Sequence, residues 1–201
     1  MVRFASVLCA PVLAFVIAGP ALAAPTLDPA QMPAGTYVLD QKHASLNARV
    51  RHMGLSSYTM RFRKVDAHFD YDPKNPMASK VEVTVDVNSL DTGDQQFGPK
   101  FARDFLGGDR YPTATFVSTG FQQLTPTSGV MTGDLTLKGV TKPVELSVTF
   151  DGYASGIVAG QRAGFSATGR IHREDFGVTF LVPGIIGDDV DLDIEVEFTK
   201  T

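Results

Sequence analysis

Alternation of apolar and polar residues is the feature that most constrains the fold of this chain of 201 residues. In the run from Val190 to Phe198, an apolar side chain at every second position alternates with four acidic ones. A period of two is typical of a β-strand with one buried and one solvent-exposed face. Similar runs cover residues 46–52, 81–87, 144–151 and 165–172, and shorter ones cover 37–40, 58–71, 113–121 and 130–137.

Turn sequences separate these runs, and each contains proline or glycine, as at residues 72–76, 126–129, 138–139 and 154–156. Eight or nine short strands at this spacing predict an all-β barrel or sandwich. A closed antiparallel barrel also leaves no unpaired strand edge. The only helix that we expect is short, running from about Pro99 to Leu106 and ending at Gly107-Gly108.

The predicted interior combines large and small side chains. Leu46, Ala48, Val50 and His52 share the inward face of one strand. Small inward residues such as Ala48, Ala167 and Gly169 would widen the interior of a barrel, and eight strands leave room for one slender ligand.

Two segments are too apolar for ordinary connections. Phe97, Phe101 and Phe105 recur every four residues, which places them in one stripe on a helix. Residues 176–186 form an apolar loop interrupted by one proline and two glycines. Apolar loops need a cover, and two interpretations stay open: the segments plug the barrel ends, or they line the mouth of an apolar cavity.

The first 23 residues have the features of a secretory signal peptide. Arg3 supplies the positive start, and the apolar run that follows, residues 4–17, is shorter than a membrane span needs. The small-residue pattern Ala21-Leu22-Ala23 predicts cleavage after Ala23. Residues 24–35, which contain three prolines, then predict a flexible leader before one domain at 36–201.

The cysteine content and the net charge indicate in which compartment the protein works and which classes of partner it can bind. Cys9 is the only cysteine and leaves with the signal peptide, so the mature chain has no disulfide and no thiolate site. Loss of Arg3 leaves 17 of the 18 lysines and arginines against 22 acidic residues, a net charge of about −5. This balance disfavours nucleic acid as a partner. Export without disulfides favours a bacterial periplasm.

We identify no catalytic motif and no metal site in the sequence. The four histidines, His43, His52, His68 and His172, show no helical metal-binding spacing, and we expect structural or surface roles for most of them. The inward His52 either donates to a ligand oxygen or satisfies a buried carbonyl. For Arg173 and Asp175, we favour a salt bridge that fixes the following turn over contact with a ligand.

The order of several short motifs resembles the YceI-like family of periplasmic polyisoprenoid-binding proteins. These motifs are YVLD at 37–40, HASL at 43–46, VRHMG at 50–54, SLDT at 89–92, YPTATF at 111–116, GDLTLKGVTKP at 133–143 and REDFG at 173–177. The resemblance implies an extended, lipocalin-like barrel of eight antiparallel strands with one short helix. It also implies a bound isoprenoid or similar amphiphile and no metal or other cofactor.

The leading hypothesis is therefore a periplasmic binding or carrier protein, not an enzyme, that holds a polyisoprenoid or quinone-like lipid inside the barrel. Its alternatives are a ligand-free structural or stress-response protein and, third, an enzyme acting on a bound lipid. We expect transient contact with a membrane or membrane proteins and consider a dimer as the oligomeric state. The predicted ligand-binding residues are Leu46, Ala48, Val50, His52, Phe62, Phe97, Phe101, Phe105, Phe116, Val148, Phe165 and Phe180.

Overall fold

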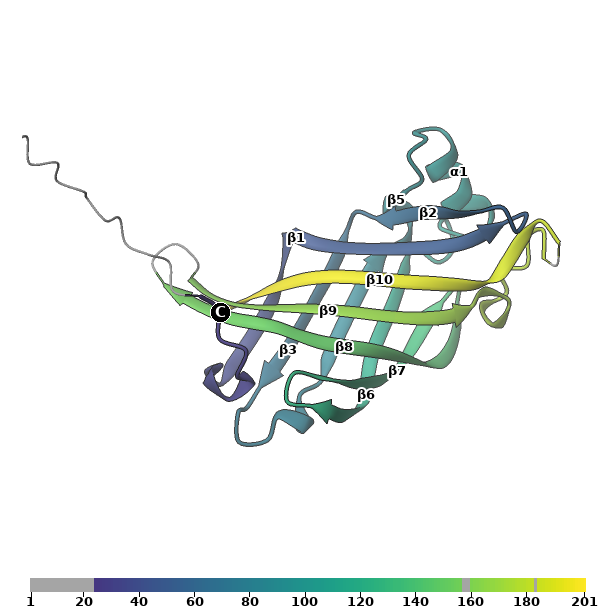
Figure 1. Cartoon of the computed structure of the whole chain (residues 1–201). Helices are drawn as coiled ribbons and strands as arrows, with labels where there is room; N and C mark the ends of the chain where they lie inside the picture. The colour runs from purple at the N-terminus through teal and green to yellow at the C-terminus, as the bar shows by residue number, and fades with distance from the viewer. Residues whose placement is uncertain (1–23, 157–159, 183) are drawn as a thin grey trace, which may run out of the picture.

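The computed structural model describes residues 24–156, 160–182 and 184–201 (Figure 1). The expected signal peptide with its cleavage site after Ala23 lies outside these residues, as does Pro183 of the apolar loop. The strands are β1 (Gly35–His52), β2 (Ser56–Phe62), β3 (Val65–Tyr71), β4 (Val81–Asp86), β5 (Leu90–Asp91), β6 (Thr113–Thr125), β7 (Ser128–Leu137), β8 (Val140–Gly156), β9 (Gly160–His172) and β10 (Ile186–Lys200). The α-helix α1 spans Phe97–Asp104, and four short 3₁₀ turns are η1 (Pro29–Gln31), η2 (Pro76–Ala78), η3 (Val87–Ser89) and η4 (Arg173–Phe176).

Eight strands form a closed antiparallel ring in the order β1-β3-β4-β6-β7-β8-β9-β10, and the pairing of β10 with β1 closes it. The hairpin strand β2 pairs with the second half of β1, and the two-residue β5 pairs with β2. Figure 1 shows an elongated barrel with α1 at one end and the C-terminus at the other. The predicted eight-stranded antiparallel barrel with one helix is confirmed.

Two predicted segments are divided differently in the structure. The runs at 37–40 and 46–52 belong to one strand, β1, whose pairing with β10 shifts register between Leu39 and Ala44. The run at 58–71 is instead two strands, because the chain turns at Arg63 and Lys64, whose amides donate to the carbonyl and the hydroxyl of Ser89.

The interior has two hydrophobic clusters. One lies at the end near α1 and includes Ala48, Val50, Met60 and Ile171. The other fills the opposite end, where five rings with neighbouring centroids 5.0–6.0 Å apart form the aromatic cluster, defined as Tyr37, Phe69, Phe150, Phe165 and Phe198. The barrel is therefore closed at this end by stacked and edge-to-face aromatic side chains.

The leader, residues 24–35, contacts that closed end of the barrel. The backbone of Thr26 exchanges two 2.9 Å hydrogen bonds with Tyr153, and the hydroxyl of Tyr71 donates to the carbonyl of Pro29. Met32 is buried among the aromatic rings. Pro29 suits the first position of the turn η1, where a backbone N–H has no partner within the turn. No helix in the described ranges is long and apolar enough to cross a membrane.

Candidate functional site

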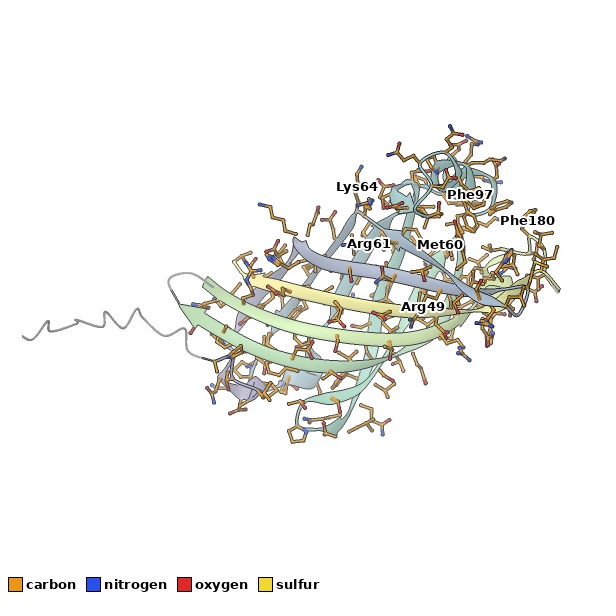
Figure 2. All side chains as sticks on the ribbon, turned by 45° about the horizontal axis from the view of Figure 1, so that its top comes forward. Arg49, Met60, Arg61, Lys64, Phe97 and Phe180 are labelled. Atoms are coloured by element: carbon orange, nitrogen blue, oxygen red, sulfur yellow. The ribbon has the colours of Figure 1, made fainter. Side chains whose placement is uncertain are left out.

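A cavity of about 460 Å³ lies at the end of the barrel that carries α1. Its walls come from β1, β2, α1, the loop after η4 and the start of β10. Figure 2 shows Phe97 of α1 and Phe180 of the loop at this same end, with Met60 of β2 nearby. Most of the lining side chains are aliphatic or aromatic, so the space suits an apolar molecule.

The structure brings eight of the twelve predicted ligand-binding residues together around this cavity. They are Ala48, Val50, His52, Phe62, Phe97, Phe101, Phe105 and Phe180. Alternation along β1 places the first three on one inward face, and four-residue spacing places three phenylalanines on one side of α1. Residues far apart in sequence thus converge on one space.

The other four predicted residues lie outside the cavity lining. Leu46 and Val148 lie on β1 and β8 farther from the mouth, and both are partly buried. The ring of Phe116 covers Gly133, where a Cβ would lie 2.3 Å from its Cζ. Phe165 belongs to the aromatic cluster at the closed end.

Several lining residues were missed by the sequence reasoning, including Tyr58, Met60, Arg173, Val178 and Leu192. A signal existed for some of them, since Tyr58 and Met60 share the alternation phase of Phe62. Leu192 lies on the inward face of a run already predicted to be a strand. No periodic signal marks Arg173 or Val178, because both lie beyond the end of β9.

Helix α1 begins at Phe97, two residues earlier than predicted, because the carboxylate of Asp94 accepts hydrogen bonds from the amides of Gln96 and Phe97. The ring centroids of Phe97 and Phe101 are 5.8 Å apart, and those of Phe101 and Phe105 are 4.8 Å apart. The predicted aromatic stripe is therefore present.

The apolar loop is joined to the helix by aromatic stacking. The rings of Phe105 and Phe180 lie 4.0 Å apart between centroids, at an interplanar angle of 23°. Since both residues also line the cavity, the structure favours the interpretation that these two segments line a mouth over the plug interpretation.

Arg173 organises the same loop from inside. Its guanidinium is buried and donates to the carbonyls of Gly187 (2.8 Å), Val178 (2.8 Å), Phe180 (2.9 Å) and Ile186 (3.1 Å). Burial lowers the pKa of Arg173 from its ordinary value.

The expected salt bridge between Arg173 and Asp175 is wrong. Across the described ranges, no carboxylate lies within ion-pair distance of this guanidinium. The turn is instead fixed by backbone acceptors and by Gly177, whose φ of 69° suits glycine.

Few polar groups face the cavity. His52 lines the mouth opposite Ser56 in the β1–β2 hairpin, and the Tyr58 hydroxyl donates to the carbonyl of Thr92 at 3.3 Å. The lining of this cavity is therefore mostly apolar.

One group of side chains has the composition of a metal site. His172, Asp188 and Asp189 offer ligand atoms within 4.8 Å of one another at the surface. Arg170 already forms a 3.3 Å ion pair with Asp189, and the Asp188 carboxylate accepts the amide of Glu174 at 2.8 Å. These partners account for both carboxylates, and we assign no metal to them.

Comparisons with known proteins agree with this architecture. A UPF0312 protein of Vibrio cholerae is 39% identical over 179 residues, which cover 88% of this chain and 93% of the relative. The crystal structure of Burkholderia cenocepacia BcnA superposes with a TM-score of 0.70 at 26% identity, over 79% of this chain and 98% of that one. A polyisoprenoid-binding domain from Saccharophagus degradans shares the fold, with a TM-score of 0.63 at 16% identity over 82% and 98% of the two chains. The model of the YceI-like domain matches residues 37–198, and the chain therefore belongs to the YceI-like domain family.

Proposed function

We propose that this protein binds a long apolar amphiphile, a polyisoprenoid or quinone-like lipid, and carries it with the tail inside the barrel. The observation that carries the proposal is the apolar cavity of about 460 Å³ at the helix end. Binding would bury lipid tail at roughly 25 cal/mol per Å² of apolar surface before the costs of association. The name of the Saccharophagus degradans domain, which has the same fold, supports a ligand of this kind.

The cavity also bears on the alternatives. A ligand-free protein with a filled core would pack its whole interior to native density, whereas here one end of the barrel is hollow. An enzyme would need a nucleophile or a general base aimed at a substrate. Among the described residues, His52 is the only histidine that lines the cavity. We therefore propose a binding role for this site.

Native mass spectrometry of the protein purified gently from its own host tests the proposal. We expect a bound lipid mass in the wild type and a reduced one in Val50→Gln, which places an amide in the cavity wall. Val38→Gln is the matched control, because Val38 lies on the outer face of the same strand and is 39% exposed. The proposal is overturned if no lipid co-purifies and labelled isoprenoids do not bind the wild type.

We further propose that the protein works in the periplasm after cleavage behind Ala23. The signal features of residues 1–23 support this. A mature chain starting at Ala24 would also keep the pairing of Thr26 with Tyr153. N-terminal sequencing of the protein from a periplasmic extract should begin at Ala24; recovery of the uncleaved chain in the cytosol would contradict the proposal.

Transient contact with a membrane would let the lipid enter and leave. Exposed apolar side chains surround the mouth, among them Leu55 (81% exposed), Met53 (56%), Phe180 (47%) and Ile185 (43%). We expect flotation with lipid vesicles to decrease in a Leu55→Ser, Ile185→Ser variant. If these exposed side chains instead mediate a dimer, the Leu55→Ser, Ile185→Ser variant will show a lower mass by light scattering than the wild type. Its flotation with vesicles will then be unchanged.

A further inference from the structure

We propose that the lipid passes directly between the cavity and the acyl layer of a membrane, without crossing water. The passage runs through the wedge, which we define as Met53, Leu55, Phe180, Leu181 and Ile185. The first two residues lie in the β1–β2 hairpin and the other three in the loop before β10, and Figure 1 shows both segments at the same end of the barrel. This proposal rests on the proposed function and specifies how the cargo enters and leaves.

Hydrogen bonds hold the two segments of the wedge together. The amide of Met53 donates to the carbonyl of Ile185 at 2.7 Å, and the amide of Ile186 donates to the carbonyl of Leu181 at 3.1 Å. The guanidinium of Arg173 donates to the carbonyl of Phe180 at 2.9 Å. Two segments that are far apart in the sequence therefore form one continuous surface.

The wedge keeps apolar side chains in water, and it does so in an unfavourable backbone conformation. Its five residues are between 41% and 81% exposed. Met53 and Leu181 have φ angles of 53° and 55°, in the left-handed region where a Cβ is crowded. They are two of the three non-glycine residues with positive φ in the part of the chain that the structure describes. Because such strain clusters at functional sites, we assign a function to this exposed surface.

The composition of the wedge favours a lipid layer over a protein as the partner. Residues 52–60 and 176–187 contain no Asp, Glu, Lys or Arg. A protein interface takes about 20–30 residues from each partner and roughly one hydrogen bond per 100–200 Å². Five apolar side chains supply neither the size nor the polar groups of such an interface. An acyl layer requires only apolar contact, which these side chains provide.

The wedge is continuous with the cavity. Phe180 and Leu181 line the cavity, although each is more than two-fifths exposed to solvent, and the neighbouring Ile186 lines it too. The cavity therefore borders the surface that would enter the acyl layer. A tail that moves between the two stays in apolar surroundings, whereas a tail released into water would expose its whole apolar surface. Contact with the membrane is thus the favourable route for exchange.

The dependence of the transfer rate on vesicle concentration tests this route. The full mature chain, loaded with a pyrene-labelled isoprenol, is mixed with phosphatidylcholine vesicles that contain a quencher lipid, and the loss of fluorescence is followed by stopped flow. We expect the rate to rise in proportion to the vesicle concentration, because each transfer needs a collision. Phosphatidylglycerol in the vesicles should not speed the transfer, since the wedge offers no lysine or arginine to an anionic lipid.

A matched pair of variants locates the contact. Leu55→Ser, Ile185→Ser should slow the transfer about tenfold, because two apolar side chains no longer favour the acyl layer. Its retention of the probe at equilibrium should be unchanged, since neither residue lines the cavity. Leu124→Ser is the control, because Leu124 is 62% exposed on β6 and lies outside the wedge, and it should transfer at the wild-type rate.

The outcomes separate the two proposals. If the wild type does not bind the probe, the proposed function fails for isoprenoids and direct transfer fails with it. If the probe binds but leaves at a rate independent of vesicle concentration, the carrier function stands and direct transfer is overturned. The wedge is also overturned as the contact if the double variant transfers as fast as Leu124→Ser, or if phosphatidylglycerol speeds the transfer.

Discussion

The guanidinium of Arg173 is a buried cation whose acceptors are all backbone carbonyls. A lysine could not reproduce this arrangement, because its ammonium is a point charge rather than a planar fork of five donors. The carbonyls of Val178 and Phe180 in the apolar loop thereby gain a hydrogen-bond donor. Arg173 thus supports the mouth of the site from within.

Replacement of Arg173 by methionine should loosen the loop and destabilise the protein. The variant leaves four carbonyls without their donor, and we expect the free energy of unfolding in urea to fall by about 3 kcal/mol. Hydrogen exchange should also rise at the amides of Val178 and Ile186. Arg170→Met is the matched control on β9, because the Arg170 side chain is 57% exposed. Equal losses in both variants would contradict the role given to Arg173.

Asp40 stabilises the closed end in a pH-dependent manner. Its carboxylate accepts hydrogen bonds from Arg162 at 2.6 Å, from His43 at 2.8 Å and from the Lys42 amide, and these hold the pKa of Asp40 well below its usual range. Because the folded-state pKa is depressed, this stabilisation is present above the unfolded pKa of about 3.9 and is lost as the pH falls toward the folded value.

Asp40→Asn should therefore lower the free energy of unfolding by about 1 kcal/mol at neutral pH. The difference between variant and wild type should shrink as the pH is lowered below about 4. Denaturation curves at a series of pH values measure this, with Asp109→Asn as an exposed control. A difference that stays constant down to the lowest pH would show that Asp40 acts through packing rather than charge.

At the scale of elements, the strands were predictable because alternation depends on local sequence. The two segments whose division into strands was predicted wrongly also contain a sequence signal for the correct division. In each of them the phase of the apolar–polar alternation changes. The inward positions on β1 change from odd at Tyr37 and Leu39 to even at Ala48 and Val50, and the register shift lies between them. The run at 58–71 changes phase in the same way at the turn between β2 and β3.

The mouth of the cavity was harder to predict, since it depends on contacts between distant elements. The stacking of Phe105 on Phe180 and the hydrogen bonds of Arg173 to loop carbonyls leave no periodic pattern in the sequence. The aromatic stripe and the apolar loop could each be recognised, but their meeting over one cavity required the fold.

The cap of α1 offers a test at this scale. Removing the Asp94 carboxylate in Asp94→Ala leaves the first amides of the helix without acceptors and should cost about 1 kcal/mol. Because α1 forms part of the mouth, we also expect faster release of a bound fluorescent lipid in stopped-flow displacement. Release at the wild-type rate, despite a lower stability, would show that the helix end does not control the exit.

At the scale of the whole molecule, the two ends of the barrel differ in how their interiors are filled. The closed end combines the aromatic cluster with the anchored leader, and the other end keeps a cavity under α1 and the loop. Hydrophobic residues at regular spacing predicted the ring of strands. They did not predict which half would be filled, because Phe165 and Phe101 are equally apolar in sequence and differ only in their neighbours.

This division predicts opposite effects for two matched substitutions. Phe69→Ala removes a ring that contacts Tyr37, Phe165 and Phe198, so it should cost about 3 to 5 kcal/mol of unfolding free energy. Phe101→Ala, in the cavity wall, loses fewer packed neighbours and should cost less, yet it should weaken lipid retention more. Urea denaturation and native mass spectrometry of both variants measure the two quantities. Equal stability losses together with equal retention would mean that the barrel holds its ligand along its whole length, because the closed end would then contribute to binding as much as the mouth.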